Sequence, residues 1–100
     1  MSLAKGNRFE REVAAMFTAG GFDVRGLEQE GDHLCIRADG VTLHSECKRQ
    51  EVLRIPLWWR QTLRDCPKGA LPVLTFRQSR QEPLSVLRTA DLIRLLGGDS

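Results

Sequence analysis

Cysteines are few in this sequence, and their spacing matches neither a disulfide framework nor a common zinc site. Three occur among the 100 residues, and no two are arranged as Cys-x-x-Cys. An odd number argues against a set of paired disulfides. We therefore expect buried thiols in a reducing cytoplasm.

Long apolar runs are also missing. No stretch approaches the roughly 18 residues of a membrane-spanning helix. The opening residues, MSLAKGNRFE, lack the apolar core of a signal peptide. These absences predict a cytoplasmic protein without a membrane partner.

A large excess of charge of one sign is absent as well. The formal net charge is +2, so charge alone does not identify a nucleic-acid-binding protein. Twelve of the 15 basic residues are arginines, however, and arginine is suited to bidentate contacts with phosphate. The length and a hydrophobic content of 41% predict a single domain, residues 1–100, with a real core.

Hydrophobic spacing and turn residues predict alternating helices and strands. An amphipathic helix is expected over about residues 5–19 and ends at two glycines. The remaining predicted elements are strands at 22–26, 32–38 and 41–48, a helix at 56–66 begun by Pro56, strands at 70–77 and 83–88, and a final helix at 90–96 capped by Thr89 and closed by Gly97 and Gly98. This order predicts an α/β protein with an α-β-β-β-α-β core, in which a mixed central sheet is flanked by helices.

Two adjacent tryptophans lie in the second predicted helix. Helical spacing aligns Trp59 with Leu63 and Cys66 on one side. We therefore expect Trp59 to pack in the core. Trp58 would then point away, toward a substrate or a second subunit.

The stretch VTLHSECKRQ (41–50) ends an otherwise apolar strand with two charged side chains. Glu46 and Lys48 are two residues apart, so on a strand they share one face. Alone, such a pair is typical of an exposed ion pair of little energetic value. Two further acids favour another interpretation. Asp32 lies at the entry to the preceding strand, and Glu10 lies at the border of the first helix's apolar stripe. Three acids from three elements would converge beside one lysine.

The turn between the two strands decides whether Asp32 shares a face with Glu46. Asp39-Gly40 is a strong hairpin signal, but a strict two-residue turn there places Asp32 on the face of Cys47 instead. Convergence requires either a three-residue loop or a bulge near residue 32, and bulges are common beside active sites. We predict such an irregularity in the ladder.

Three short motifs are spread along the chain: KGNRFERE (5–12), GD (31–32) and ECK (46–48). Together they resemble the PD-(D/E)XK nuclease superfamily, in the small form of archaeal-type Holliday junction resolvases and related phage endonucleases. The first motif is the most specific, and the predicted element order also matches over nearly the whole chain. Gly31 stands where these proteins often have a proline.

The resemblance implies a restriction-endonuclease-like fold and metal-dependent cleavage of DNA. Glu10, Asp32, Glu46 and Lys48 would be the catalytic residues. Asp32, Glu46 and the backbone carbonyl of Cys47 would hold the metal. Mg²⁺ is the implied cofactor, with Mn²⁺ as a substitute, because a hard cation needs only one or two carboxylates beside its waters. Lys48 would orient the attacking water or stabilise developing negative charge.

Several neighbouring residues are weaker candidates. His44 lies on the strand face of the predicted glutamate and lysine, where it would line the site. Gln61 resembles the polar residue that related nucleases direct toward the metal, the alternative being a solvent-facing glutamine. A structural zinc held by His33, His44, Cys35 and Cys47 is a third possibility, but these residues lack the tight ligand pairs of such sites.

Four arginines follow the predicted site: Arg49, Arg54, Arg60 and Arg64. They form either a solvated helix face or a phosphate-binding edge that holds DNA without reading its sequence. The sequence leaves both interpretations open.

We interpret the chain as a Mg²⁺-dependent endodeoxyribonuclease, similar to Holliday junction resolvases, with branched DNA as the expected substrate. One active site per chain and two nicks per junction favour a C₂ homodimer. Alternatives are a nicking or restriction-like nuclease on duplex or single-stranded DNA, a nuclease fold that binds DNA without cutting, and a structural dimerisation module. The presence of all three acids and the lysine favours cleavage, whereas a structural module would leave them scattered.

Overall fold

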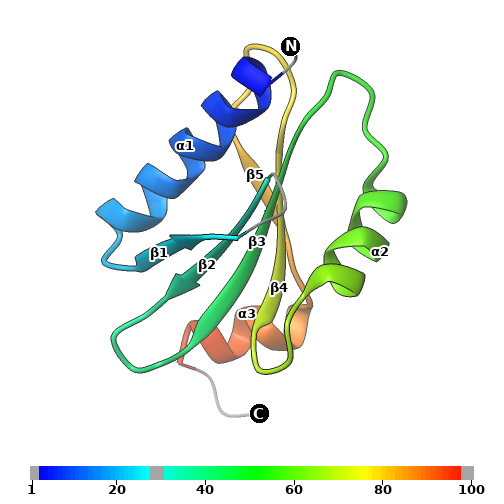
Figure 1. Cartoon of the computed structure of the whole chain (residues 1–100). Coiled ribbons are helices and arrows are strands. Elements are labelled where there is room, and N and C mark those ends of the chain that lie inside the picture. Colours follow the sequence, from blue (N-terminus) through cyan, green and yellow to red (C-terminus); the bar gives the residue numbers. More distant parts are fainter. Residues whose placement is uncertain (1–2, 28–30, 98–100) are drawn as a thin grey trace.

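The computed structural model describes residues 3–27 and 31–97 (Figure 1). In this part of the chain the elements are, in order, α1 (Leu3–Ala19), β1 (Asp23–Gly26), β2 (Asp32–Ile36), β3 (Thr42–Arg49), α2 (Ile55–Asp65), β4 (Leu71–Arg77), β5 (Leu84–Val86) and α3 (Thr89–Leu95). The five strands form one sheet in the order β1-β2-β3-β4-β5; β3 and β4 are parallel and the other pairs antiparallel. The predicted mixed sheet flanked by helices is confirmed.

One face of the sheet is covered by α1 and α3. A buried cluster of Cys35, Leu43 and Val73 lies on this face. Phe17 of α1 and Leu95 of α3 pack against it. Phe9 and Val13 of the apolar stripe that predicted α1 are buried, whereas Met16 remains 58% exposed.

The middle of α1 is held at the end of β4. Arg77, the last residue of β4, forms a 2.6 Å ion pair with Glu12 of α1. Its guanidinium carbon also lies 4.9 Å from the centroid of the Phe9 ring. Because Phe9 and Glu12 lie on either side of Glu10 along the helix, these contacts keep Glu10 near the end of the sheet where β3 and β4 finish.

The opposite face is covered by α2, with Trp58 turned inward. Trp58 is buried against Leu74 and Phe76, and its ring centroid lies 6.3 Å from that of Phe76. Trp59 is only partly buried at the edge of this cluster. The prediction that Trp59 forms the core while Trp58 points away is therefore wrong, because the inward stripe of α2 runs through Trp58 and Thr62.

The hairpin between β2 and β3 has a three-residue loop, residues 38–40. The amide of Arg37 donates to the carbonyl of Val41 at 2.8 Å and closes the loop. Gly40 has a φ of 90°, the left-handed conformation that such loops need at this position. Pairing continues without a break to Asp32. The three-residue alternative is right, and the predicted bulge near residue 32 is wrong.

The final helix begins without the predicted cap. Thr89 is the first residue of α3, and Arg88 occupies the capping position without a side-chain hydrogen bond to the helix. Gly97, with a φ of 89°, follows the helix, and Gly98 lies outside the described residues. Arg37 of the hairpin donates to the carbonyl oxygen of Leu95 at 3.2 Å, which attaches α3 to the β2–β3 loop.

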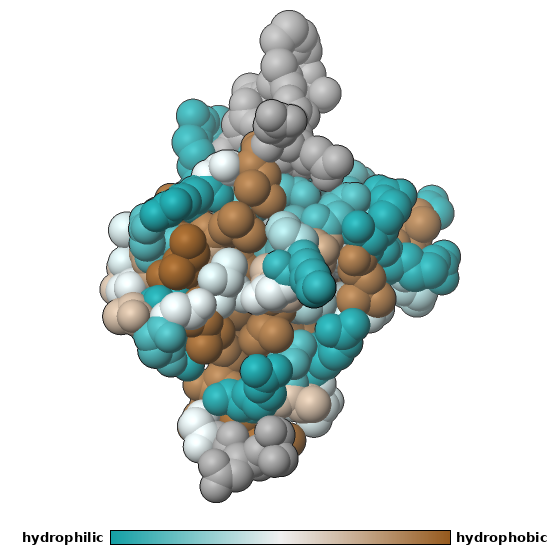
Figure 2. Space-filling model, turned by 60° about the horizontal axis from the view of Figure 1, so that its bottom comes forward, coloured by the Kyte–Doolittle hydropathy of each residue, from teal (hydrophilic) through white to brown (hydrophobic). Residues whose placement is uncertain are grey.

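Hydrophobic side chains also gather on the surface. Figure 2, with the lower end of the molecule turned forward, shows them between hydrophilic regions. The exposed members at α3 are Leu92 and Ile93 of the helix and Leu96, which follows its last residue. No helix in the described ranges combines the length and hydrophobicity needed to cross a membrane.

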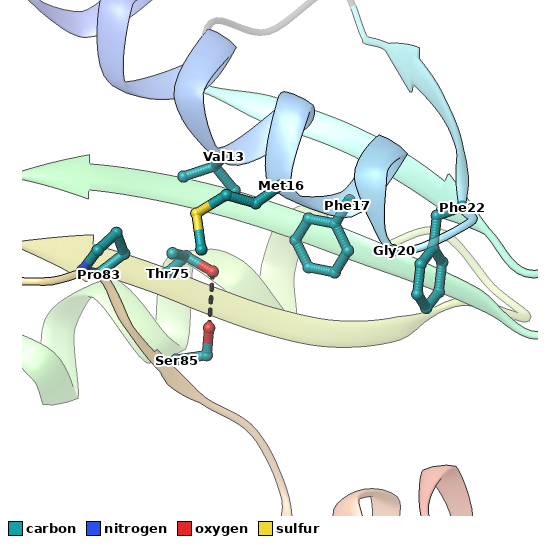
Figure 3. A pocket seen from close by; sticks show the side chains of 8 residues that line it. All are labelled: Val13, Met16, Phe17, Gly20, Phe22, Thr75, Pro83 and Ser85. Atoms are coloured by element: carbon teal, nitrogen blue, oxygen red, sulfur yellow. Dashed lines mark hydrogen bonds between the residues drawn. The ribbon is translucent and has the colours of Figure 1, made fainter.

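A groove of about 260 Å³ lies between α1 and strands β4 and β5 (Figure 3). Met16 of α1 reaches over it toward Thr75 and Ser85, whose hydroxyl oxygens are 3.0 Å apart. Thr75 is in register with Cys47, and strand alternation therefore puts the groove on the face opposite to Glu46. The groove is separate from the residues considered next.

Candidate active site

Asp32 and Glu46 are direct partners in the β2–β3 ladder. The neighbouring pair is hydrogen-bonded, since the amide of Cys47 donates to the carbonyl of Gly31 at 2.9 Å. Asp32 and Glu46 therefore form a non-hydrogen-bonded pair, the kind in which side chains approach more closely. Both side chains are buried on one face of the sheet.

Lys48 lies beside Glu46 on the same face of β3. Its Nζ is 3.7 Å from Glu46 Oε1, and 28% of its side chain remains exposed. Burial raises the pKa of Glu46, and the charge of Asp32 adds to the shift. Lys48 and the nearby Thr62 hydroxyl act in the opposite direction without cancelling it. If both were ionised, Asp32 and Glu46 would carry one more negative charge than Lys48 balances.

His44 completes the buried polar row on β3. Its Nε2 lies 3.0 Å from Asp32 Oδ2, and none of its side chain is exposed. His44 precedes Glu46 by two residues and is the diagonal neighbour of Asp32, a separation that long side chains bridge. His33 points to the other face, and burial lowers its pKa.

Glu10 approaches the same end of the sheet from α1. Gly31 has a φ of 88°, and a Cβ built on it would lie 3.6 Å from Glu10 Oε1 and 3.3 Å from the Cys47 carbonyl oxygen. Both oxygens thus border the space left by the missing side chain, one residue before Asp32. Proline cannot adopt a positive φ, which explains why this chain departs from the resembled motif here.

Cys47 offers its carbonyl oxygen, not its thiol, to the site. Strand alternation turns its side chain to the face opposite Glu46. Burial raises the pKa of the Cys47 thiol to about 12 and that of Cys35 to about 11. Both thiols are therefore neutral, which suits packing and not catalysis.

Helix α2 contributes two residues that the sequence did not indicate. The buried Thr62 hydroxyl lies 2.8 Å from the Trp58 carbonyl and also acts on Glu46. The carboxylate of Asp65 acts electrostatically on Glu46. Trp58, Thr62 and Asp65 follow helical spacing on one face, so placing Trp58 inward would have revealed both. Gln61 is not solvent-facing, since its Oε1 is buried with no hydrogen-bond partner among the described residues.

The four arginines lie beyond this row of residues. Arg49 ends β3 and is partly buried, whereas Arg54, Arg60 and Arg64 are exposed. Arg64 pairs with Asp65 at 3.0 Å. Asp32 and Glu46 form no ion pair with these four arginines in the described part of the chain.

The donor set fits a hard cation that retains several waters. Among the described residues, no group of three or more His, Cys, Asp or Glu side chains is arranged to hold a metal by itself. Asp32 and Glu46 nevertheless face each other, and Glu46 Oε2 is buried without a hydrogen-bond partner in the described ranges. Two carboxylates and a carbonyl oxygen are a set that Mg²⁺ accepts and zinc rarely uses.

Comparisons with known proteins bear on the fold and the family. A family model described as "Phage putative PDDEXK endonuclease" matches residues 1–98. Among solved structures, the chain is similar to Hjc, a Holliday junction resolvase of the archaeal hyperthermophile Archaeoglobus fulgidus, with a TM-score of 0.55 and 15% identity over 96% of this chain and 98% of that one. A comparison with curated proteins found no match. The structural likeness confirms the predicted restriction-endonuclease-like fold.

Proposed function

The chain belongs to the phage PDDEXK endonuclease family, and from this premise we propose that it is a divalent-metal-dependent endonuclease that hydrolyses phosphodiester bonds in DNA. One observation carries the proposal: Asp32 and Glu46, two buried acids, are paired across the β2–β3 ladder, and Lys48 lies 3.7 Å from Glu46. A buried pair of acids with a single adjacent lysine suits the binding of a cation and an anion together.

The residues have distinct roles in this proposal. The carboxylates of Asp32 and Glu46, with the Cys47 carbonyl, would hold Mg²⁺, and Mn²⁺ would substitute for it. The bound cation would supply a water of lowered pKa and positive charge at the phosphoryl oxygens. Lys48 orients the attacking water or stabilises negative charge on the phosphate. Glu10 holds a second cation or a water beside the first.

Branched DNA, such as a four-way junction, is the proposed substrate. The support is the shared fold with a Holliday junction resolvase and the small size of a chain that carries one site. Two paired nicks need two sites, so a C₂ homodimer is proposed as the assembly. Trp58 is buried and cannot be its interface. The proposed location is the cytoplasm.

Cleavage of labelled four-way junction, duplex and single-stranded DNA with Mg²⁺ or Mn²⁺ tests the proposal. We expect the wild-type protein to cut only with a divalent cation, and Glu46→Ala and Lys48→Ala to lose activity while remaining folded. Glu82→Ala and Lys68→Ala are matched controls, because both residues are exposed and lie outside the site.

Each outcome separates the alternatives. Preference for the junction supports a resolvase, and preference for linear DNA supports a nicking or restriction-like nuclease. If the wild-type protein binds DNA and cuts none of the substrates, the non-cleaving DNA-binding alternative replaces the proposal. Light scattering of the purified protein tests the dimer independently.

A further inference from the structure

His44 is a fully buried polar side chain next to the acids. It lies on the central strand β3, between Leu34 of β2 and Pro72 of β4 in the ladder. None of the side chain is exposed to solvent, and its Nε2 is 3.0 Å from Asp32 Oδ2. The other ring nitrogen, Nδ1, is buried and has no hydrogen-bond partner among the described residues.

An apolar residue would serve this position better if packing were its only role. Both ladder neighbours, Leu34 and Pro72, lack polar side-chain atoms. Burying an imidazole nitrogen without a partner costs free energy of folding. The hydrogen bond to Asp32 is the feature that the imidazole supplies and that a leucine would not.

The chemistry of the acceptor sets the direction of this hydrogen bond. A carboxylate oxygen only accepts, so Nε2 of His44 must carry the proton that it shares with Asp32. This arrangement engages Oδ2 and leaves Oδ1 of Asp32 as the oxygen for a cation.

We propose that His44 is a positioning residue for Asp32: by holding Oδ2, it fixes the carboxylate in the orientation that presents Oδ1 toward Glu46 and a divalent cation. The inference rests on the proposed function, because it assigns Asp32 to a cation. Hydrogen bonds from second-layer residues commonly orient metal-binding carboxylates, and their loss typically weakens metal binding by about 10- to 100-fold.

Two variants test the role by titrating MnCl₂ into the protein in a calorimeter, without DNA. His44→Leu removes the donor and fills the apolar position; we expect normal folding and Mn²⁺ affinity reduced by about 10- to 100-fold. His44→Gln keeps an N–H donor at similar reach and should stay within about threefold of the wild-type affinity. Thermal unfolding without metal should show both variants folded.

The outcomes separate this inference from the proposed function. If the wild-type protein binds no Mn²⁺ and cuts no DNA, the proposed function fails and the inference falls with it. If the wild type binds Mn²⁺ and His44→Leu binds it equally well, only the role of His44 is overturned. Should His44→Leu not fold, long-range ¹H–¹⁵N spectra of the wild type decide: the proton must be on Nε2, and the opposite tautomer overturns the proposal.

Discussion

Asp32 and Glu46 face each other across the β2–β3 ladder, and both are nearly buried, with 4% and 6% of their surfaces exposed. Like charges in a buried pair disfavour ionisation. The pKa of Glu46 is accordingly raised above its ordinary value of 4.5, first by burial and then by Asp32. The site is therefore unfavourable for folding in its fully ionised form, and a cation would relieve that cost.

This relationship predicts that Glu46→Gln stabilises the metal-free protein at neutral pH. Between pH 4.5 and the raised pKa, the folded protein binds more protons than the unfolded chain. The free energy of unfolding of the wild type therefore falls as the pH rises through that window. Glu46→Gln should lack this decrease and unfold at higher urea concentration at pH 7.

Urea unfolding in EDTA at several pH values measures the effect. Glu82→Gln is the control, because Glu82 is exposed and should shift neither the midpoint nor its pH dependence. A Glu46→Gln variant that is less stable than the wild type at pH 7, with the same pH dependence, would show that Glu46 is not under this electrostatic strain.

A comparison of two glycines separates backbone strain from the geometry of the site. Gly31 and Gly40 have φ values of 88° and 90°, so an alanine is strained at either position by about 1 kcal/mol. A Cβ at Gly40 meets nothing within 4 Å, whereas one at Gly31 lies 3.3 Å from the Cys47 carbonyl oxygen and 3.6 Å from Glu10 Oε1. Both variants should lose stability, and Gly31→Ala should lose more, because its new Cβ must also displace the Cys47 carbonyl.

Only Gly31→Ala should also weaken Mn²⁺ binding and DNA cleavage, because only its new methyl group displaces proposed metal-site oxygens. For each variant, calorimetric titration measures Mn²⁺ affinity, the cleavage assay measures activity and thermal unfolding measures stability. Equal metal affinity in Gly31→Ala and Gly40→Ala would argue against the Cys47 carbonyl and Glu10 as parts of the site.

The elements could be predicted from the sequence because their signals are local. Periodic apolar residues and glycines marked α1, the hairpin and β4 within a few residues of their observed ends. The length of the hairpin loop could not be predicted from the neighbouring residues alone. Arg37 at the loop also binds Leu95, 58 residues away, and Asp39 at 2.8 Å. The residues Asp39 and Gly40 predict a turn, but they give no information about the contact between Arg37 and Leu95.

The candidate site could be predicted in part, because strand alternation is a local signal. Asp32, Glu46 and Lys48 follow from strand alternation once the loop has three residues. Asp65 and Thr62 were missed because helical spacing aligned Trp59 with Leu63 and Cys66 and so favoured the wrong one of two adjacent tryptophans. The position of Leu74 and Phe76 on β4 decides which one packs inward, and that position is a property of the folded sheet.

The two tryptophans should differ sharply in their contribution to stability. Trp58 is 4% exposed and packs on Leu74 and Phe76, so Trp58→Ala should lower the free energy of unfolding by about 3–5 kcal/mol. Trp59 lies at the edge of the same cluster and is partly buried. Trp59→Ala should cost clearly less. Urea unfolding of the two variants checks this, and a larger loss in Trp59→Ala would contradict the packing.

The arginines around α2 should differ in their effect on DNA affinity. Arg54 and Arg60 are exposed and have no ion-pair partner among the described residues, so they are available for phosphate contacts. Arg64 is held by Asp65 at 3.0 Å, which competes with phosphate. We expect Arg54→Ala and Arg60→Ala to weaken binding more than Arg64→Ala does.

Fluorescence anisotropy with labelled DNA at several salt concentrations, in Ca²⁺ or EDTA to prevent cleavage, measures these affinities. Each lost phosphate contact should reduce the slope of log affinity against log salt by about 1, because fewer counterions are released on binding. Arg25→Ala is the control, since Arg25 pairs with Asp23 on the edge strand β1. If Arg25→Ala lowers the slope as much as Arg54→Ala and Arg60→Ala, DNA does not bind preferentially along α2, and the arginines there form an ordinary solvated helix face.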